Sequence, residues 1–222
     1  MRKKIIVVTP HPDDETLGCG GTLLKYKEEN HQIYWLIVTE MGDGFSNEHK
    51  QRRKEEIYTV SNCYQFEEVF ELNYPAAGLD KVPVGDLIGS ISKVFAKVQP
   101  QIIFAPYPGD IHSDHKAVFD ATVSCTKWFR HPSVEKVLTY ETLSETDFSI
   151  DPDANGFKPN IYINISGFLE EKISVMNIYA SEISEFPFPR SEKAIRSLAY
   201  LRGAASGYEE AEAFMLLKER IE

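Results

Sequence analysis

Two short polar stretches contain the residue types that metal-assisted hydrolysis uses. The first is His11-Pro12-Asp13-Asp14-Glu15 and the second is His112-Ser113-Asp114-His115. Imidazole and carboxylate groups with no thiolate beside them suit Zn²⁺ or another first-row divalent ion. Two histidines and one aspartate would leave a coordination position open for water, which is typical of catalytic zinc and not of structural zinc.

Helix capping is the competing explanation for the acidic residues of the first stretch. Carboxylates at a helix N-terminus accept hydrogen bonds from free amides and complement the helix dipole. One aspartate would need no further explanation, but a histidine ahead of two adjacent aspartates exceeds what a cap requires. Because two neighbouring carboxylates do not easily bind one ion, one of them would remain free as a base. The pattern favours metal-assisted hydrolysis, in which the ion brings the pKa of a water toward about 7.

The segments around the two stretches predict where they lie. The run Ile5–Val8 is short and β-branched, and Gln101–Tyr107 is the clearest strand in the chain, so each polar stretch follows a buried strand. A helix follows each stretch, the first opening near Asp13–Thr16 and the second running to about Trp128. Two more strands and two more helices alternate with these, the strands at Gln32–Thr39 and Val69–Leu72 and the helices at 46–63 and 84–98.

This alternation predicts an α/β fold, a Rossmann-like three-layer sandwich with a mainly parallel sheet of order 3-2-1-4-5. In that order strands 1 and 4 are neighbours at the switch point, where open α/β sheets bind ligands. We therefore expect the two polar stretches to meet in one crevice. His112 and His115 are three residues apart at a helix start, so they share one face.

The C-terminal third is less regular. Strands are predicted at Lys136–Leu143 and Ile161–Ile165, joined by a loop rich in Asp, Pro, Asn and Gly, and these add strands to the sheet. Helical patterns follow at Gly167–Ser181 and Ser191–Ala205, whereas Ala211–Lys218 is ambiguous between helix and strand. No repeat or linker divides the chain, so residues 1–222 are expected to form one domain.

Composition limits the partners and the compartment. The balance of 24 Lys+Arg against 34 Asp+Glu gives a net charge of −10, which argues against nucleic-acid or anionic-membrane binding. No apolar run approaches the ~20 residues that span a bilayer, and the apolar part of the N-terminus is too short for a signal peptide. Three widely spaced cysteines indicate a reducing compartment, so we expect a cytoplasmic protein. Homo-oligomerisation is left open.

The two motifs together resemble those of the PIG-L/LmbE-like family of zinc-dependent N-acetylglucosamine-type deacetylases, which carry an HPDDE block and an HxDH block after the first and fourth strands. The similarity extends to Gly20-Gly21, Arg53–Glu56, Arg202-Gly203 and Ala211–Phe214, nearly the whole chain. The resemblance implies removal of acetate from an N-acetylated amino sugar, carried as a small-molecule conjugate.

The resemblance also implies a role for each motif residue. The zinc ligands would be His11, Asp14 and His115. The general base would be Asp13. His112 would stabilise the oxyanion, with Asp114 as its orienting partner that favours the imidazolium form. Glu15 matches the motif but is left out of the catalytic set.

One departure from the family concerns the loop after the third strand. Many members have an Asp-Gly pair there that can bind sugar hydroxyls, whereas this chain has Ala76-Ala77-Gly78. The difference weakens an assignment to the thiol-cofactor branches and favours a cell-envelope sugar precursor. Arg53, Arg190 and Arg202 are candidate contacts for a phosphate or carboxylate on the substrate.

Three other functions remain as alternatives. A metal-dependent phosphohydrolase would also use acidic strand ends, but it would prefer Mg²⁺ held by oxygen ligands, and the histidines favour zinc. A non-catalytic sugar-binding module of the same fold would need neither Asp13 nor His112. A dinucleotide site is disfavoured because Gly18-Cys19-Gly20-Gly21 lacks the GxGxxG spacing.

Overall fold

The computed structural model describes residues 2–150 and 156–221, so residues 151–155 of the predicted Asp- and Pro-rich loop lie outside the described part. A seven-stranded sheet has the order β3-β2-β1-β4-β5-β7-β6. Its strands are β1 Lys4–Thr9, β2 Gln32–Glu40, β3 Glu68–Pro75, β4 Ile102–Pro106, β5 Lys136–Tyr140, β6 Ile161–Asn164 and β7 Ala211–Glu219. The helices are α1 Asp14–Glu28, α2 Asn47–Tyr64, α3 Val84–Val98, α4 Ser113–Ser124, α5 Leu169–Met176, α6 Glu192–Ser206 and the short 3₁₀ helix η1 Leu79–Lys81.

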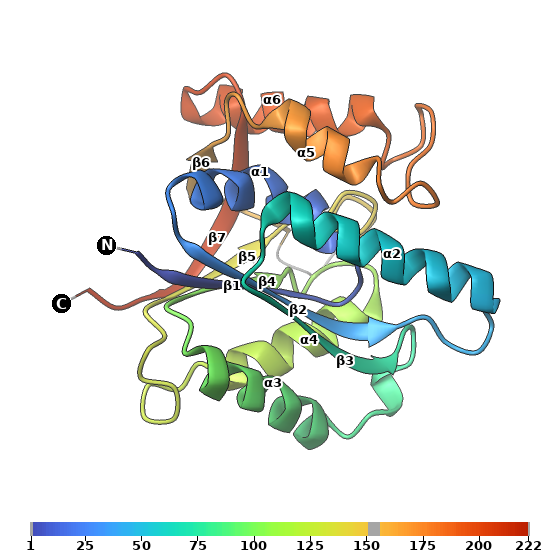
Figure 1. The fold of residues 1–222 in the computed structure, drawn as a ribbon. Coiled ribbons are helices and arrows are strands. Elements are labelled where there is room, and N and C mark those ends of the chain that lie inside the picture. Colours follow the sequence, from blue (N-terminus) through green and yellow to red (C-terminus); the bar gives the residue numbers. More distant parts are fainter. Residues whose placement is uncertain (1, 151–155, 222) are drawn as a thin grey trace.

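The three-layer arrangement and the strand order 3-2-1-4-5 are confirmed. Helices α1, α2, α5 and α6 cover one face of the sheet, and α3 and α4 cover the other (Figure 1). The central strand β1 is buried on both faces, which explains its unbroken apolar run. Ile5 and Val7 pack into the core under α1 and α2, while Ile6 and Val8 pack into the core over α3 and α4.

The C-terminal strands extend the sheet beyond the predicted order. The ambiguous segment is a strand, β7, which runs antiparallel between β5 and β6. Its Phe214 is fully buried and lies in register with Tyr140 of β5, so tertiary packing decides what the local pattern left open.

Two helices are shorter than the pattern predicts. Helix α4 ends at Ser124 because i→i−3 hydrogen bonds tighten the chain there, and the Thr126 hydroxyl donates to the Val123 carbonyl. Helix α5 ends at Met176, well before Ser181, and the chain after it forms turns with i→i−3 hydrogen bonds, such as that from the Tyr179 N–H to the Met176 carbonyl. In the described residues, no helix has the length and apolarity that a membrane span requires.

Close packing of α1 against the sheet fixes the turn that precedes it. A Cβ added at Gly18 would lie 2.2 Å from the Tyr140 ring, and one at Gly21 would lie 2.8 Å from Ile165. Only glycine allows so close an approach. The N-terminus of α1 is thereby held at the carboxyl end of β1.

Candidate active site

The turns after β1 and β4 bring three predicted ligands together. β1 pairs in parallel with β4, with Val7 opposite Phe104, so their carboxyl ends lie side by side. One donor atom from each of His11, Asp14 and His115 falls within a cluster whose members all lie within 4.8 Å of one another. The expected meeting of the two polar stretches is therefore present.

The surroundings of His115 fit a metal ligand. Its ring is fully buried, and Nε2 has no hydrogen-bond partner among the described residues, although it lies 3.5 Å from Asp14 Oδ2. A buried polar atom without a partner is costly, and a lone pair aimed at a carboxylate and a second imidazole suits a cation. The donor set of two imidazoles and one carboxylate fits Zn²⁺ or a similar ion.

Asp110 completes the environment of His115, and sequence reasoning did not identify it. Its Oδ2 lies 2.7 Å from His115 Nδ1, and its Oδ1 accepts a hydrogen bond from Thr146 Oγ1 at 2.6 Å. With the ring proton on Nδ1, directed at Asp110, the Nε2 lone pair is left for the ion. The available signal was position, since Asp110 lies in the loop between β4 and the second polar stretch.

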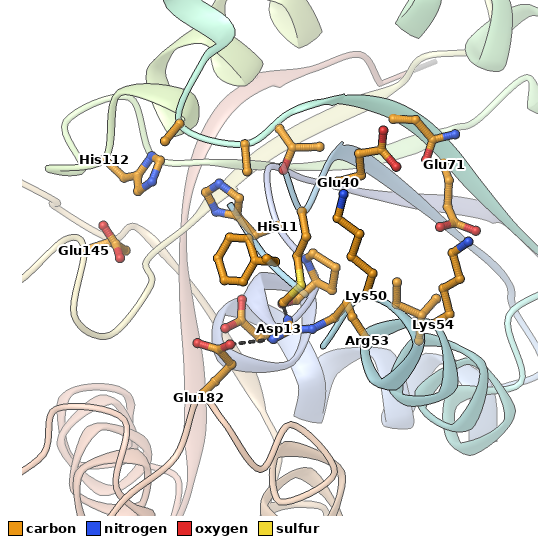
Figure 2. Close-up of a pocket in the computed structure, with 18 of the residues that line it drawn as sticks. His11, Asp13, Glu40, Lys50, Arg53, Lys54, Glu71, His112, Glu145 and Glu182 are labelled. Carbon is orange, nitrogen blue, oxygen red and sulfur yellow. Dashed lines mark hydrogen bonds and ion pairs between the residues drawn. The ribbon is translucent and has the colours of Figure 1, made fainter. Parts of the chain in front are cut away.

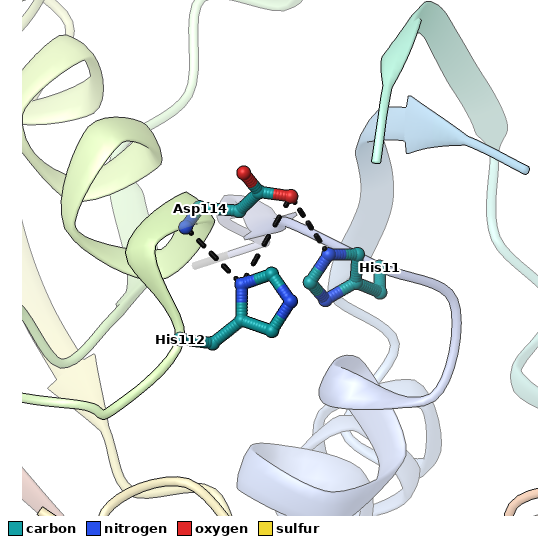
Figure 3. A group of neighbouring side chains, drawn as sticks. All are labelled: His11, His112 and Asp114. Carbon is teal, nitrogen blue, oxygen red and sulfur yellow. Dashed lines mark hydrogen bonds and ion pairs between the residues drawn. The ribbon is translucent and has the colours of Figure 1, made fainter. Parts of the chain in front are cut away.

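A second group of possible ligands shares His11 and adds His112 and Asp114 (Figure 3). Asp114 is fully buried, and its carboxylate accepts hydrogen bonds from the backbone N–H groups of Ala77 and Leu79 at 2.7 and 3.3 Å. Its Oδ2 also lies 3.1 Å from His11 Nε2. Because these amides already occupy Asp114, His11, Asp14 and His115 form the better ligand set.

The geometry of Asp114 differs from the expectation that it orients His112. Its Oδ2 is 4.0 Å from His112 Nδ1, beyond hydrogen-bond reach, and that nitrogen instead accepts the backbone N–H of Asp114 at 3.2 Å. Burial lowers the pKa of His112, and the neighbouring His11 lowers it further. The charge of Asp114 raises that pKa, the direction that the resemblance implied, and a neutral ring would carry its hydrogen on Nε2.

Electrostatics at the ligand cluster favour a positive charge. Burial opposes ionisation of His11, but hydrogen bonds to Asp114 and Asp14 outweigh it and raise the pKa of His11 to about 10. Burial also opposes ionisation of Asp14, yet His115 and His11 hold the pKa of that carboxyl well below its usual range. A metal ion would displace the His11 proton, so we expect metal binding to strengthen as pH rises.

Asp13 does not act as a side-chain cap. It is the residue before α1, but its carboxylate makes no capping hydrogen bond and instead accepts one from Arg190 at 2.8 Å. Burial raises the pKa of Asp13 to about 8, and Arg190 opposes that rise. The capping explanation therefore fails for this residue, whose carboxyl is weakly acidic enough to exchange a proton near neutral pH.

A cavity of about 650 Å³ opens beside these residues. Figure 2 shows His11 and His112 toward one end and Lys54 and Glu71 toward the other, in keeping with the separation of β4 from β3 in the sheet. The lining residues are His11, Pro12, Asp13, Thr39, Glu40, Met41, Phe45, Lys50, Arg53, Lys54, Ile57, Glu71, Asn73, Ala76, Ala77, His112, Glu145, Glu182 and Arg190. A cavity of this size holds more than a single small group.

The sequence model of the PIG-L family, described as GlcNAc-PI de-N-acetylase, matches residues 6–126. The chain belongs to the PIG-L family. The match contains both polar stretches, most of β1 and all of β2, β3 and β4, so the resemblance drawn from the motifs is confirmed.

Several relatives of this PIG-L chain are named as deacetylases. Diacetylchitobiose deacetylase of Thermococcus kodakarensis is 26% identical over 227 residues, which cover 95% of this chain and 81% of that one. The probable N-acetyl-alpha-D-glucosaminyl L-malate deacetylase 2 of Bacillus anthracis is 22% identical and covers 82% of each chain. The crystal structure of the conserved protein TT1542 from Thermus thermophilus superposes with a TM-score of 0.81 at 25% identity, covering 99% and 97% of the two chains.

The three predicted arginine contacts have different positions in this PIG-L chain. Arg53 and Arg190 line the cavity, but both donate hydrogen bonds to Glu182. Figure 2 shows Arg53 beside Glu182, and Arg53 also donates to the Pro12 carbonyl. Arg202 on α6 does not line it and forms two hydrogen bonds with Glu141, at 2.7 and 2.5 Å. The structure therefore does not bring Arg202 to the candidate site.

Proposed function

We propose that this chain is a metal-dependent amide hydrolase that removes the N-acetyl group from an N-acetylglucosamine-type sugar conjugate. The observation that carries the proposal is the buried Nε2 of His115, which has no hydrogen-bond partner among the described residues and lies beside Asp14 and His11. His11 lines a cavity that Asp13 and His112 also line. The names of the relatives support the deacetylase activity. A cytoplasmic location and a single domain over residues 1–222 stay predictions, and homo-oligomerisation stays open.

His11, Asp14 and His115 would hold the ion, with Zn²⁺ preferred and another first-row divalent ion acceptable. When bound, such an ion polarises a carbonyl group and lowers the pKa of a water molecule. Asp110 would fix the ring of His115 through the hydrogen bond at Nδ1.

Asp13 would act as the general base. It takes one proton from the water that attacks the acetamide carbonyl and later gives it to the nitrogen as the C–N bond breaks. Water and amide are thereby converted to acetate and a free amine. The raised pKa of Asp13, caused mainly by burial, suits a carboxyl that must both accept and return a proton.

His112 would stabilise the negative charge that develops on the carbonyl oxygen. Since its Nδ1 accepts the Asp114 N–H, its Nε2–H is the donor available to the cavity. Removal of one such donor commonly costs about 10²–10³-fold in turnover. Asp114 would help indirectly, because its carboxylate holds the loop at Ala77 and Leu79 against the start of α4.

The other half of the cavity would receive the group attached to the sugar. Ala76 and Ala77 provide no carboxylate for sugar hydroxyls, as the sequence indicated. The ammonium group of Lys54 makes no hydrogen bond or ion pair with any described residue, and among those residues the ammonium group of Lys50 has only the exposed Asp43, at 3.6 Å. We infer that an anionic group on the conjugate would be met by these lysines and not by the carboxylate-bound arginines.

Metal analysis and acetate release test the proposal together. The purified protein should contain about one divalent ion per chain and release acetate from a panel of N-acetylated sugar conjugates. His115→Ala should lose most of the metal. Phosphate release from phosphorylated sugars without acetate release would favour the phosphohydrolase alternative, and metal binding with neither activity would favour a binding module.

A pair of neighbouring variants separates base from ligand. Asp13→Asn keeps the shape of the side chain and removes its basicity, so metal content should persist while turnover falls by about 10²–10⁴-fold. Asp14→Asn should weaken metal binding, and added zinc should partly restore its activity. If zinc instead rescues Asp13→Asn and not Asp14→Asn, the two roles are reversed.

A further inference from the structure

Asp13 has a backbone conformation that side chains rarely adopt. Its φ is 116° and its ψ is −29°, in the left-handed half of conformational space, and the residue is almost completely buried. A non-glycine residue is strained there and keeps the conformation only where its surroundings hold it. The carbonyl of Asp13 accepts the amides of Thr16 and Leu17, which fixes one side of the residue.

The other side is fixed by Glu15. The backbone N–H of Asp13 donates to Glu15 Oε2 at 3.0 Å. Glu15 is fully buried, has no ion-pair partner among the residues described, and also accepts hydrogen bonds from the hydroxyls of Thr16 at 2.7 Å and Tyr179 at 2.8 Å. Burial of a carboxylate costs free energy, and the three hydrogen-bond donors around Glu15 offset part of that cost. A buried acidic group supported in this way beside a candidate active site suggests a functional role.

Tyr179 connects this carboxylate to a segment that also contacts the side chain of Asp13. It lies just after α5, is fully buried, and has the Arg53 guanidinium 5.5 Å from its ring. The same segment, residues 179–190, also carries Arg190, whose guanidinium donates to Asp13 Oδ2 at 2.8 Å. The segment therefore contacts the side chain of Asp13 directly and its backbone through Glu15.

We propose that Glu15 and Tyr179 are positioning residues for the general base. They hold the backbone N–H of Asp13 so that its carboxylate points into the cavity instead of capping α1. The inference rests on the proposed role of Asp13 as base. A displacement of about 1 Å in a reacting group can cost roughly 10²-fold in rate, so a loosened Asp13 should lower kcat while the ion and the substrate still bind.

Tyr179→Phe is the principal test, and Tyr64→Phe is its matched control. Both tyrosines are fully buried and both lose one hydroxyl donor, but Tyr64 donates to Thr16 Oγ1 and makes no hydrogen bond to Glu15. We expect Tyr179→Phe to lower kcat about tenfold, with KM within about twofold and metal content unchanged. Tyr64→Phe should leave kcat within about twofold.

Two substitutions of Glu15 extend the test. Glu15→Ala removes the acceptor and should lower kcat about 10²-fold. Glu15→Gln can turn its carbonyl oxygen toward the Asp13 amide, because the two hydroxyls can rotate to accept from its NH₂ group, and it should recover kcat to within about fivefold of the parent. Crystal structures of the Tyr179→Phe and Glu15→Ala proteins should show φ of Asp13 leaving the left-handed region.

Parallel losses of thermal stability and kcat in Tyr179→Phe and Tyr64→Phe would overturn the inference and leave a purely structural network. Full kcat in Tyr179→Phe with unchanged φ of Asp13 would also overturn it. Failure of the base assignment is distinguishable, because Asp13→Asn would then keep its turnover whatever the Tyr179 variants do.

Discussion

Replacement of Arg190 by methionine should move the pH profile of the enzyme. Arg190 lies in a cluster of carboxylates, with a guanidinium nitrogen 2.8 Å from Asp13, 3.1 Å from Glu145 and 3.3 Å from Glu182. Methionine keeps most of the apolar stem and removes the charge. Glu182 retains Arg53 as an ion-pair partner, so Asp13 and Glu145 are the groups that lose their ion pair.

The size of the effect follows from the pKa of Asp13. Burial raises that pKa to about 8, and Arg190 is the main group that opposes the rise. An adjacent arginine lowers a carboxyl pKa by about 1–3, so its loss should move the acidic limb of kcat/KM up by about one to three pH units. In the proposed mechanism the ionised carboxylate is the base, so activity at pH 7 should fall by about 10–10³-fold and recover toward alkaline pH.

Acetate release measured across the pH range, with metal content checked at each pH, gives the two profiles. Arg196→Met is the control, since Arg196 lies on α6, pairs with Glu170 and Glu192, and does not line the cavity. Its profile should match the parent. A uniform drop for Arg190→Met at every pH, with no shift of the acidic limb, would refute the electrostatic reasoning.

Three further outcomes are expected. Lys172→Met should lower the free energy of unfolding by about 3 kcal/mol in urea titrations, because the buried carboxylate of Glu212 loses the ammonium group 2.7 Å away. Adding Glu212→Gln should recover part of this loss. Burial lowers the pKa of His131, so this residue contributes stability that is lost as pH falls through about 6.5. The Tm of the parent should therefore fall relative to that of His131→Gln as pH decreases through that value, and a Tm difference that does not change with pH would contradict this reasoning. Free N-acetylglucosamine should be a poorer substrate than a conjugate with an anionic group, because contacts remote from the reacting amide can contribute at the transition state. Lys54→Gln should raise KM for the conjugate about fivefold. Equal rates of hydrolysis for the free sugar and the conjugate would contradict the inference.

The parts of the fold that depend on local pattern could be predicted from the sequence. The β-branched run of β1 and the apolar run of β4 indicated buried strands, and the rules for parallel sheets made them neighbours. The meeting of His11 and Asp14 with His115 followed from that topology alone. The antiparallel β7 could not be assigned, because its conformation depends on pairing with β5 and β6, which are distant in sequence.

Side-chain partners across loops were beyond sequence reasoning. Asp114 precedes His115 directly and was expected to serve His112, yet backbone amides of the loop at Ala77 and Leu79 claim its carboxylate. Arg202 matched the family pattern but pairs with Glu141, the residue directly after β5. In both cases the partner lies on a segment distant in the sequence, and the sequence pattern does not show that the two segments are in contact.

The residues of α2 that line the cavity are under weaker structural constraint than the residues of the turns after β1 and β4. Its residues Lys50, Arg53, Lys54 and Ile57 recur at helical spacing, and the lysines of this set are the more exposed. Changes at exposed helix positions usually alter stability by less than about 0.5 kcal/mol. Changes in the buried turns after β1 and β4 would instead disturb the closely packed side chains proposed to bind the metal. Duplicated copies of such a gene could therefore exchange one sugar conjugate for another through a few codons of α2 while the hydrolytic chemistry is inherited intact.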